Sequence, residues 1–247
     1  MRLAPLDMFV PAGDGLVLRG TLTYPEGRAG AALPLAVLAH QYPTTRDSFS
    51  PLVDDLLAMG VATLAFDERG HGASTQSPDG QRIIDTPQGF TVDGFGTAFA
   101  ASAKDIGFGR IEDDVLRVAG WGIFQNFIDR ARLVLVGASV GGPGVLLAAP
   151  RIPGIRAVVT LGAAGAPAYG EDGPARVRSA VERISAPCFL ASSRDDPFGG
   201  AANVTAWGRD LSHVTSRVVP GDAHAMAIYF DVWDELLAFV RRALVLG

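Results

Sequence analysis

Three residue types that can act together on a carbonyl compound occur in order along the chain. Ser139 stands in the stretch LVLVGASVGGPG at 133–144, a carboxylate pair lies at Asp195 and Asp196, and His224 follows. A serine hydroxyl is a weak nucleophile at neutral pH and needs a general base, which a carboxylate must orient. An imidazole with a pKa near 6.5 suits that role. These residues predict attack by the serine on a carbonyl carbon.

The glycines around Ser139 also have a second interpretation, a turn that approaches a dinucleotide. VGASVGGPG resembles the glycine-rich turn of short-chain dehydrogenases. Three departures count against it: Pro143 replaces the last glycine, several predicted strands precede the turn, and no tyrosine is followed by a lysine four residues later. The residues found at that offset are Arg28, Arg46, Gly173 and Trp233. The departures favour the nucleophile, and binding of NAD would revive the alternative.

The predicted elements bring the three residue types to the ends of strands. Short continuous apolar runs indicate strands covered on both faces, expected at 33–39, 61–67, 133–137 and 155–162, with two more at 188–193 and 215–221. Amphipathic stretches predict helices at 47–60, 111–129, 175–184 and 229–245. Residues 7–24 predict a β-hairpin across the turn AGDG. The alternation indicates a mostly parallel sheet with helices on both faces.

The order of serine, acid and histidine, each after a later strand, resembles the α/β-hydrolase superfamily over nearly the whole chain. Two further stretches carry the resemblance. The segment 40–43, HQYP, is similar to the family's oxyanion loop, with Gln41 where a glycine is usual, and the segment 66–74, FDERGHGAS, is similar to the turn after the next strand. The resemblance implies an α/β-hydrolase fold in a single domain over 1–247, like that of a small esterase or a dienelactone hydrolase.

The resemblance also implies roles for the catalytic residues. Ser139 is expected to be the nucleophile and His224 the base, and Gly137 and Gly141 to allow a tight strand-to-helix turn. Asp196 is expected to be the acid because the family usually has its aspartate directly before proline or a similar residue. Asp195 remains an alternative to Asp196, with Asp222 as a third choice.

The resemblance assigns the remaining site to the backbone and to the loop after the first parallel strand. The N–H groups of Val140 and Tyr42 are expected to stabilise the oxyanion. Gln41 and Tyr42 are expected to contact the substrate. His40 and His71 are expected to be structural hydrogen-bond partners, and His213 to lie at a solvent-exposed helix end.

The connection at 73–110 is unusually long and contains one plausible helix, around 96–105. Connections of this length are often lids or binding loops. The interval between the strands at 155–162 and 188–193 is too short for the large cap found in many relatives. We therefore expect a minimal cap, with the 73–110 segment as a lid or binding loop over the site.

Composition narrows the function classes. The chain has 247 residues and a net charge of -5, so neither a nucleic acid nor an anionic membrane surface is an expected partner. No apolar run reaches the length of a membrane span, and the N-terminus lacks a signal peptide's apolar core, which predicts a cytoplasmic protein. Cys188 is the single cysteine, and the four histidines show no metal-binding spacing. No metal or cofactor is expected.

The combined prediction is a serine hydrolase that cleaves a small-molecule carboxylic ester through an acyl-enzyme. Thioester hydrolysis, acyl transfer, peptide cleavage and perhydrolysis stay open because the fold does not fix the substrate. A non-catalytic ligand-binding relative and a homo-oligomer also stay open.

Overall fold

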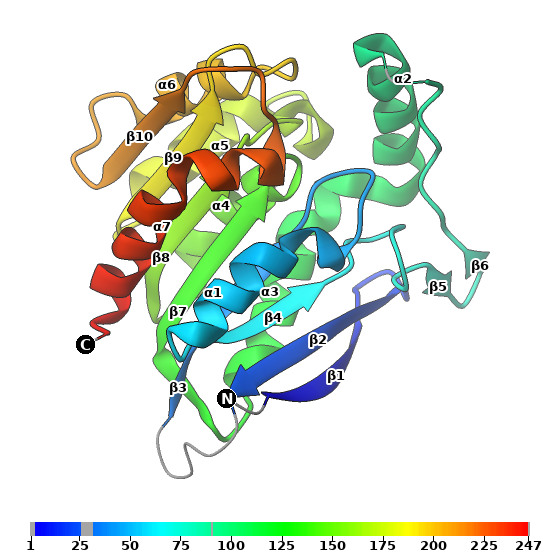
Figure 1. Ribbon diagram of the computed structural model, residues 1–247. Helices are drawn as coiled ribbons and strands as arrows, with labels where there is room; N and C mark the ends of the chain where they lie inside the picture. The colour runs from blue at the N-terminus through cyan, green and yellow to red at the C-terminus, as the bar shows by residue number, and fades with distance from the viewer. Residues whose placement is uncertain (1–2, 26–31, 90, 247) are drawn as a thin grey trace.

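One large sheet organises the chain (Figure 1). The computed structural model describes residues 3–25, 32–89 and 91–246. The strands of this sheet follow the order β1-β2-β4-β3-β7-β8-β9-β10. Their bounds are β1 Leu3–Pro11, β2 Val17–Pro25, β3 Leu33–Ala39, β4 Ala62–Phe66, β7 Ile128–Ala138, β8 Ile155–Leu161, β9 Cys188–Ser193 and β10 Val214–Val219. β1 and β2 form an antiparallel hairpin, β2 pairs antiparallel with β4, and the remaining pairs are parallel.

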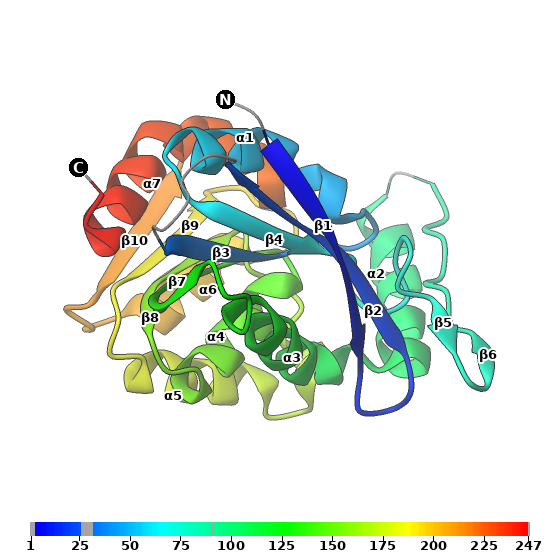
Figure 2. The same ribbon diagram turned by 90° about the horizontal axis from the view of Figure 1, so that it is seen from below.

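Helices cover both faces of the sheet (Figure 2). One face carries α1 (Ser50–Ala58) and α7 (Tyr229–Leu244). The other carries α3 (Ile111–Ile123), α4 (Gly141–Ala148), α5 (Gly173–Arg183) and α6 (Gly200–Gly208). The prediction of an α/β-hydrolase fold with a mostly parallel sheet and an N-terminal hairpin is confirmed. No helix within the described ranges combines the length and the apolar character that a membrane span requires.

The central strand β3 shows why the sequences of the parallel strands are continuous apolar runs. All seven of its residues are buried. Leu35 and Val37 belong to the core beneath α3, whereas Ala36 and Leu38 belong to the core beneath α1 and α7. Because successive side chains point to opposite faces, a strand covered on both faces has to be apolar throughout.

The structure extends one strand and adds elements that the sequence did not predict. β7 begins at Ile128, earlier than the expected 133, because Ile128 pairs with Leu33 before a register shift. Residues 129–132, between these two pairings, include three charged side chains and none is buried, so the strand does not begin as an apolar run. The helix expected at 111–129 correspondingly ends at Ile123. Two very short strands, β5 (Gln76–Ser77) and β6 (Gly80–Gln81), pair with each other. Single turns of helix complete the chain at Arg46–Phe49, Ala103–Gly107, Phe108–Arg110, Ala149–Arg151, Ala166–Tyr169 and Ala225–Ile228.

The long connection between β4 and β7 contains α2 (Val92–Ser102). This helix begins four residues before the expected 96, since the Thr91 side chain caps it by accepting a hydrogen bond from the Gly94 N–H. α2 stands away from the sheet, at one end of the molecule (Figure 1). Phe90, just before it, lies outside the described residues.

Candidate active site

Ser139 occupies the tight turn between β7 and α4. Its φ of 48° lies in the left-handed region that residues with side chains rarely adopt. A Cβ on Gly137 would overlap the Gly141 carbonyl, and a Cβ on Gly141 would overlap the Ala39 carbonyl of the neighbouring strand. The glycines on both sides of Ser139 therefore permit the close backbone approach that the turn requires.

Ser139, His224 and Asp196 form one hydrogen-bonded chain. The Ser139 Oγ lies 2.8 Å from the His224 Nε2. The His224 Nδ1 lies 2.9 Å from both Asp196 carboxylate oxygens. The three residues follow β7, β9 and β10, parallel strands whose carboxyl ends meet at one edge of the sheet. With the Nδ1–H donated to the carboxylate, the Nε2 lone pair faces the serine hydroxyl, the arrangement needed to accept its proton.

The structure separates the two adjacent carboxylates. Asp196 is buried, and its carboxylate also accepts hydrogen bonds from the Phe198 N–H at 2.8 Å and the Ser192 hydroxyl at 3.1 Å. Asp195 is exposed, and its backbone N–H donates to the Gly221 carbonyl. The structure thus brings Asp196 to the histidine and leaves Asp195 in solvent.

His40 fixes the loop after β3. Its Nδ1 donates to the Gln41 carbonyl at 2.9 Å, and its Nε2 accepts the Glu68 N–H at 2.9 Å. Burial lowers the pKa of His40 to about 4, so the ring is neutral and keeps both contacts at neutral pH. The expectation that His40 supports this loop agrees with these contacts.

The two residues after His40 take different directions. The Gln41 side chain accepts a hydrogen bond from the Ser48 hydroxyl at 3.3 Å and is not among the residues that line the cavity. Gln41 was expected to contact the substrate, but this cavity gives no support for that contact. Tyr42 does line the cavity, and its hydroxyl donates to the Asp85 carbonyl at 2.8 Å. The oxyanion role of the Tyr42 and Val140 N–H groups stays a prediction.

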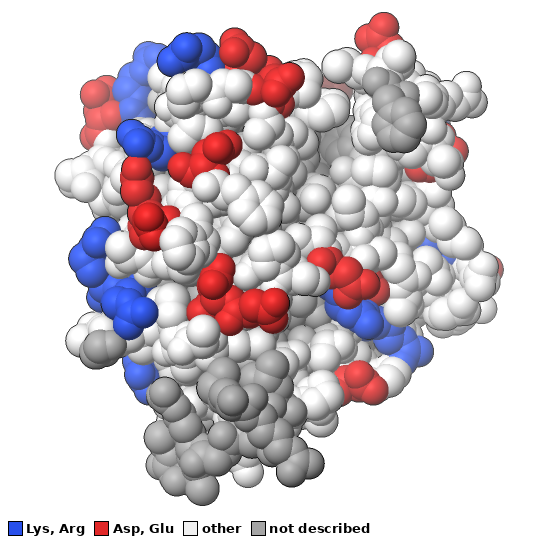
Figure 3. All heavy atoms as spheres, in the orientation of Figure 1, with Lys and Arg blue, Asp and Glu red and all other residues white. Residues whose placement is uncertain are grey.

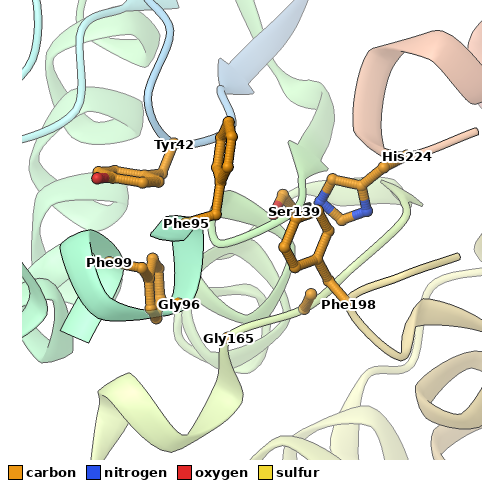
Figure 4. Close-up of a pocket in the computed structure, with 9 residues that line it drawn as sticks. Tyr42, Phe95, Gly96, Phe99, Ser139, Gly165, Phe198 and His224 are labelled. Atoms are coloured by element: carbon orange, nitrogen blue, oxygen red, sulfur yellow. Dashed lines mark hydrogen bonds between the residues drawn. The ribbon is translucent and has the colours of Figure 1, made fainter. Parts of the chain in front are cut away.

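A cavity of about 200 Å³ opens beside Ser139 (Figure 4). Most of its walls are aromatic rings, and the other lining residues are glycine, alanine and serine. The lining residues are Tyr42, Phe95, Gly96, Phe99, Ser139, Ala164, Gly165, Phe198 and His224. From the 73–110 connection, α2 supplies Phe95, Gly96 and Phe99, so this helix lines the same cavity as Ser139. The role of the connection as a lid or binding loop stays a prediction.

Arg69, in the turn after β4, is the centre of a buried ionic cluster that the sequence did not predict. The Arg69 guanidinium binds both Asp114 oxygens, at 2.6 and 2.9 Å, and one Asp14 oxygen at 3.0 Å. These contacts tie the turn after β4 to α3 and to the β1–β2 turn. The signal available in the sequence was the run of three charged residues, Asp67, Glu68 and Arg69, directly before the glycines of the turn.

Two further groups in this turn are buried without a hydrogen-bond partner among the described residues, the Glu68 carboxyl and the His71 Nε2. Burial, with the nearby Asp114 charge, raises the pKa of Glu68 well above its ordinary value. Burial and the His40 ring lower the pKa of His71 to about 3. The His71 ring is therefore neutral at pH 7. His213, expected at an exposed helix end, is half-buried in a turn, where its Nε2 lies 3.0 Å from the Val181 carbonyl.

The outer surface offers no extended patch of one charge on the face seen in Figure 3, where acidic and basic side chains are interspersed. Within the described part of the chain, no group of three or more His, Cys, Asp or Glu side chains is arranged to hold a metal ion.

Comparison with known proteins gives one family and many structural neighbours. A family model described as "alpha/beta hydrolase fold" matches residues 34–181. No curated protein sequence matches the chain. An esterase from Pyrococcus furiosus superposes with a TM-score of 0.67 at 18% identity, over 99% of this chain and 94% of that one. The dienelactone hydrolase from Anabaena variabilis gives 0.64 at 19%, over 100% and 97%. An esterase domain from Rhodothermus marinus gives 0.64 at 18%, over 98% and 99%. At these identities the neighbours show a shared fold.

Proposed function

This chain belongs to the alpha/beta hydrolase fold family, and we propose that it is a serine hydrolase that cleaves a small carboxylic ester. The observation that carries the proposal is the unbroken chain of hydrogen bonds from Ser139 through His224 to Asp196. Esterases among the structural neighbours support the same reaction class.

In the proposed first step, the Ser139 Oγ attacks the ester carbonyl carbon as the His224 Nε2 takes the hydroxyl proton. The C=O double bond opens to an oxyanion, which the N–H groups of Val140 and Tyr42 stabilise. When the oxyanion collapses, the bond to the alcohol oxygen breaks and the imidazolium returns its proton to that oxygen. The products of this half-reaction are the free alcohol and an acyl group on Ser139.

In the proposed second step, His224 takes a proton from water, whose oxygen attacks the acyl carbon. Collapse of the second oxyanion breaks the bond to the Ser139 Oγ, the imidazolium returns its proton to that oxygen, and the carboxylic acid is released. Asp196 stays ionised throughout, holds the imidazole with its Nε2 toward the serine, and stabilises the imidazolium. Its buried carboxylate is kept in place by the Phe198 N–H and the Ser192 hydroxyl.

The test is labelling by a fluorophosphonate probe together with hydrolysis of p-nitrophenyl acetate. We expect the wild type to be labelled and to turn over the ester, and Ser139→Ala to lose both. Ser179→Ala, a matched change at an exposed position on α5, should retain both. An unlabelled wild type that hydrolyses no ester would point to the non-catalytic ligand-binding relative, and equal turnover by Ser139→Ala would assign the activity to another residue.

A further inference from the structure

The cavity beside Ser139 is lined by the aromatic rings of Tyr42, Phe95, Phe99 and Phe198. Tyr42 and Phe99 pack edge to face, with their ring centroids 5.6 Å apart. Phe95 and Phe198 lie 6.2 Å apart, and the Phe198 ring lies 4.6 Å from the His224 ring. Figure 4 shows Tyr42, Phe95 and Phe99 on one side of Ser139, with Phe198 beside His224. We call the cavity between these rings the aromatic pocket.

Two glycines give the aromatic pocket its room. Gly96 lines the cavity and is exposed, and a Cβ there would meet no atom within 4 Å, so a side chain at this position of α2 has open space on the exposed side of the cavity. A Cβ on Gly165 would come within 2.8 Å of the Phe99 ring. Gly165 also has a φ of 76°, which disfavours any side chain there. The tip of the Phe99 ring can therefore approach the Gly165 backbone closely only because Gly165 has no side chain.

The volume sets the size of the group that fits. The aromatic pocket measures about 200 Å³, whereas an apolar cavity of about 150 Å³ is enough to hold benzene in another protein. One six-membered ring and the adjoining ester atoms fill this space. A long alkyl chain would have to leave the pocket and enter solvent.

The polarity of the lining excludes a charged substituent. None of the lining residues is a lysine, arginine, aspartate or glutamate. The Tyr42 hydroxyl is engaged with the Asp85 carbonyl, and Ser139 and His224 are engaged with each other. A carboxylate or an ammonium group placed here would lose its hydration without gaining a partner, which is costly. An uncharged ring would instead pack edge to face or offset against the aromatic walls.

We propose that the aromatic pocket binds an uncharged ring of about benzene size carried by the substrate next to its ester group, with Gly96 providing the space. The inference rests on the proposed esterase function for turnover, because it names the substrate class of that same site. Either side of the ester could carry the ring, and two probe esters distinguish these cases: benzyl acetate has it on the alcohol and methyl benzoate on the acyl group.

The first experiment compares kcat/KM in two pairs of esters. Benzyl acetate is compared with ethyl acetate, and methyl benzoate with methyl acetate. A fifth ester, 4-carboxybenzyl acetate, adds a charge to the ring of benzyl acetate. We expect at least one ring-bearing ester to exceed its alkyl counterpart by about tenfold or more, as burial of a ring predicts. The 4-carboxybenzyl ester should lose that advantage. Equal kcat/KM values for both ring and alkyl pairs, or full retention of the advantage by the carboxylate analogue, would overturn the proposal.

The second experiment fills the pocket with Gly96→Leu. This change should remove most of the preference for the ring, which is measured as the ratio of kcat/KM for the preferred ring-bearing ester to kcat/KM for its alkyl counterpart. It does not weaken α2, because leucine favours a helix more than glycine does. The matched control is Gly120→Leu on α3, where a Cβ also meets no atom within 4 Å and where the residue does not line the cavity. A ring preference that survives Gly96→Leu would refute the role of Gly96.

The third experiment separates this inference from the proposed function by measuring binding without turnover. Ser139→Ala protein is mixed with benzyl acetate, methyl benzoate or 4-carboxybenzyl acetate, and contact is detected by saturation-transfer NMR. Binding of a neutral ring ester but not of the carboxylate supports the pocket assignment even if the wild type hydrolyses none of them, which would refute only the esterase function. Hydrolysis of ethyl acetate without binding of either neutral ring ester would refute only the pocket assignment.

Discussion

Lowering the pH should destabilise the protein through His40. The unfolded chain protonates this histidine near pH 6.5, whereas burial, with a smaller contribution from Arg46, lowers its folded-state pKa to about 4. Folding therefore excludes a proton between these two values. The stabilisation is fully present above pH 6.5 and is lost as the pH falls through 4.

The size of the effect follows from the two pKa values. A difference of one pKa unit corresponds to 1.36 kcal/mol, so the gap amounts to about 3 kcal/mol once both states are protonated. Between pH 7 and pH 5 the loss from His40 alone should be about 2 kcal/mol in the free energy of unfolding. This is a large fraction of the roughly 5–15 kcal/mol typical of a folded domain.

The assay compares the wild type with His40→Gln by urea unfolding at pH 7, 6 and 5, followed by the fluorescence of the three tryptophans. Glutamine can still accept the Glu68 N–H but does not titrate, so the variant should be less stable at pH 7 and lose its disadvantage towards pH 5. His71, whose pKa is lowered to about 3, titrates in both proteins and contributes to both curves. A stability difference that stays constant from pH 7 to pH 5 would refute the reasoning.

Three further predictions follow from the contacts of single residues. Asp196→Asn should lower kcat by about 10⁴-fold, as the corresponding change does in a serine protease, whereas exposed Asp195→Asn should have little effect. The reverse order in steady-state kinetics would reassign the acid. Because burial raises the pKa of Glu68, the unfolded chain releases that proton at a lower pH than the folded one, and stability falls as the pH rises above about 4.5. As the pH rises, Glu68→Gln should therefore gain stability relative to the wild type, by up to about 1.4 kcal/mol per pH unit. A difference in the free energy of unfolding between the two proteins, measured in urea, that stays constant from pH 5 to pH 8 would contradict this. Burial raises the pKa of Cys188 to about 12, so the native protein should not react with DTNB at pH 8 while guanidinium-unfolded protein should react fully; rapid reaction of the native thiol would show that β9 opens.

Some residues of the candidate site could be predicted from the sequence and others could not. Ser139, Asp196 and His224 were expected to meet because they follow parallel strands in the order serine, acid, histidine, and the carboxyl ends of parallel strands meet at one edge of the sheet. Phe95 and Phe99 could be assigned only to a long connection, since nothing local in that segment fixes which way its helix turns. Phe198, Ala164 and Gly165 carried no signal, because their role depends on loops from different strands that converge only in the folded chain.

The sequence by itself determined the order along the chain of the strands in the large sheet, the glycine turn around Ser139 and the three residue types at later strand ends, but not the helix α6 or the short strands β5 and β6. These features follow from local chemistry: apolar periodicity, the backbone freedom of glycine, and the polarity of the side chains that follow a buried strand. Only the tertiary structure decided that Asp196 faces His224 while Asp195 faces solvent, that Gln41 bonds to Ser48 and does not line the cavity, and that α2 lines the same cavity as Ser139. These outcomes depend on side-chain direction and on contacts between segments far apart in the chain, which packing fixes and residue type alone does not.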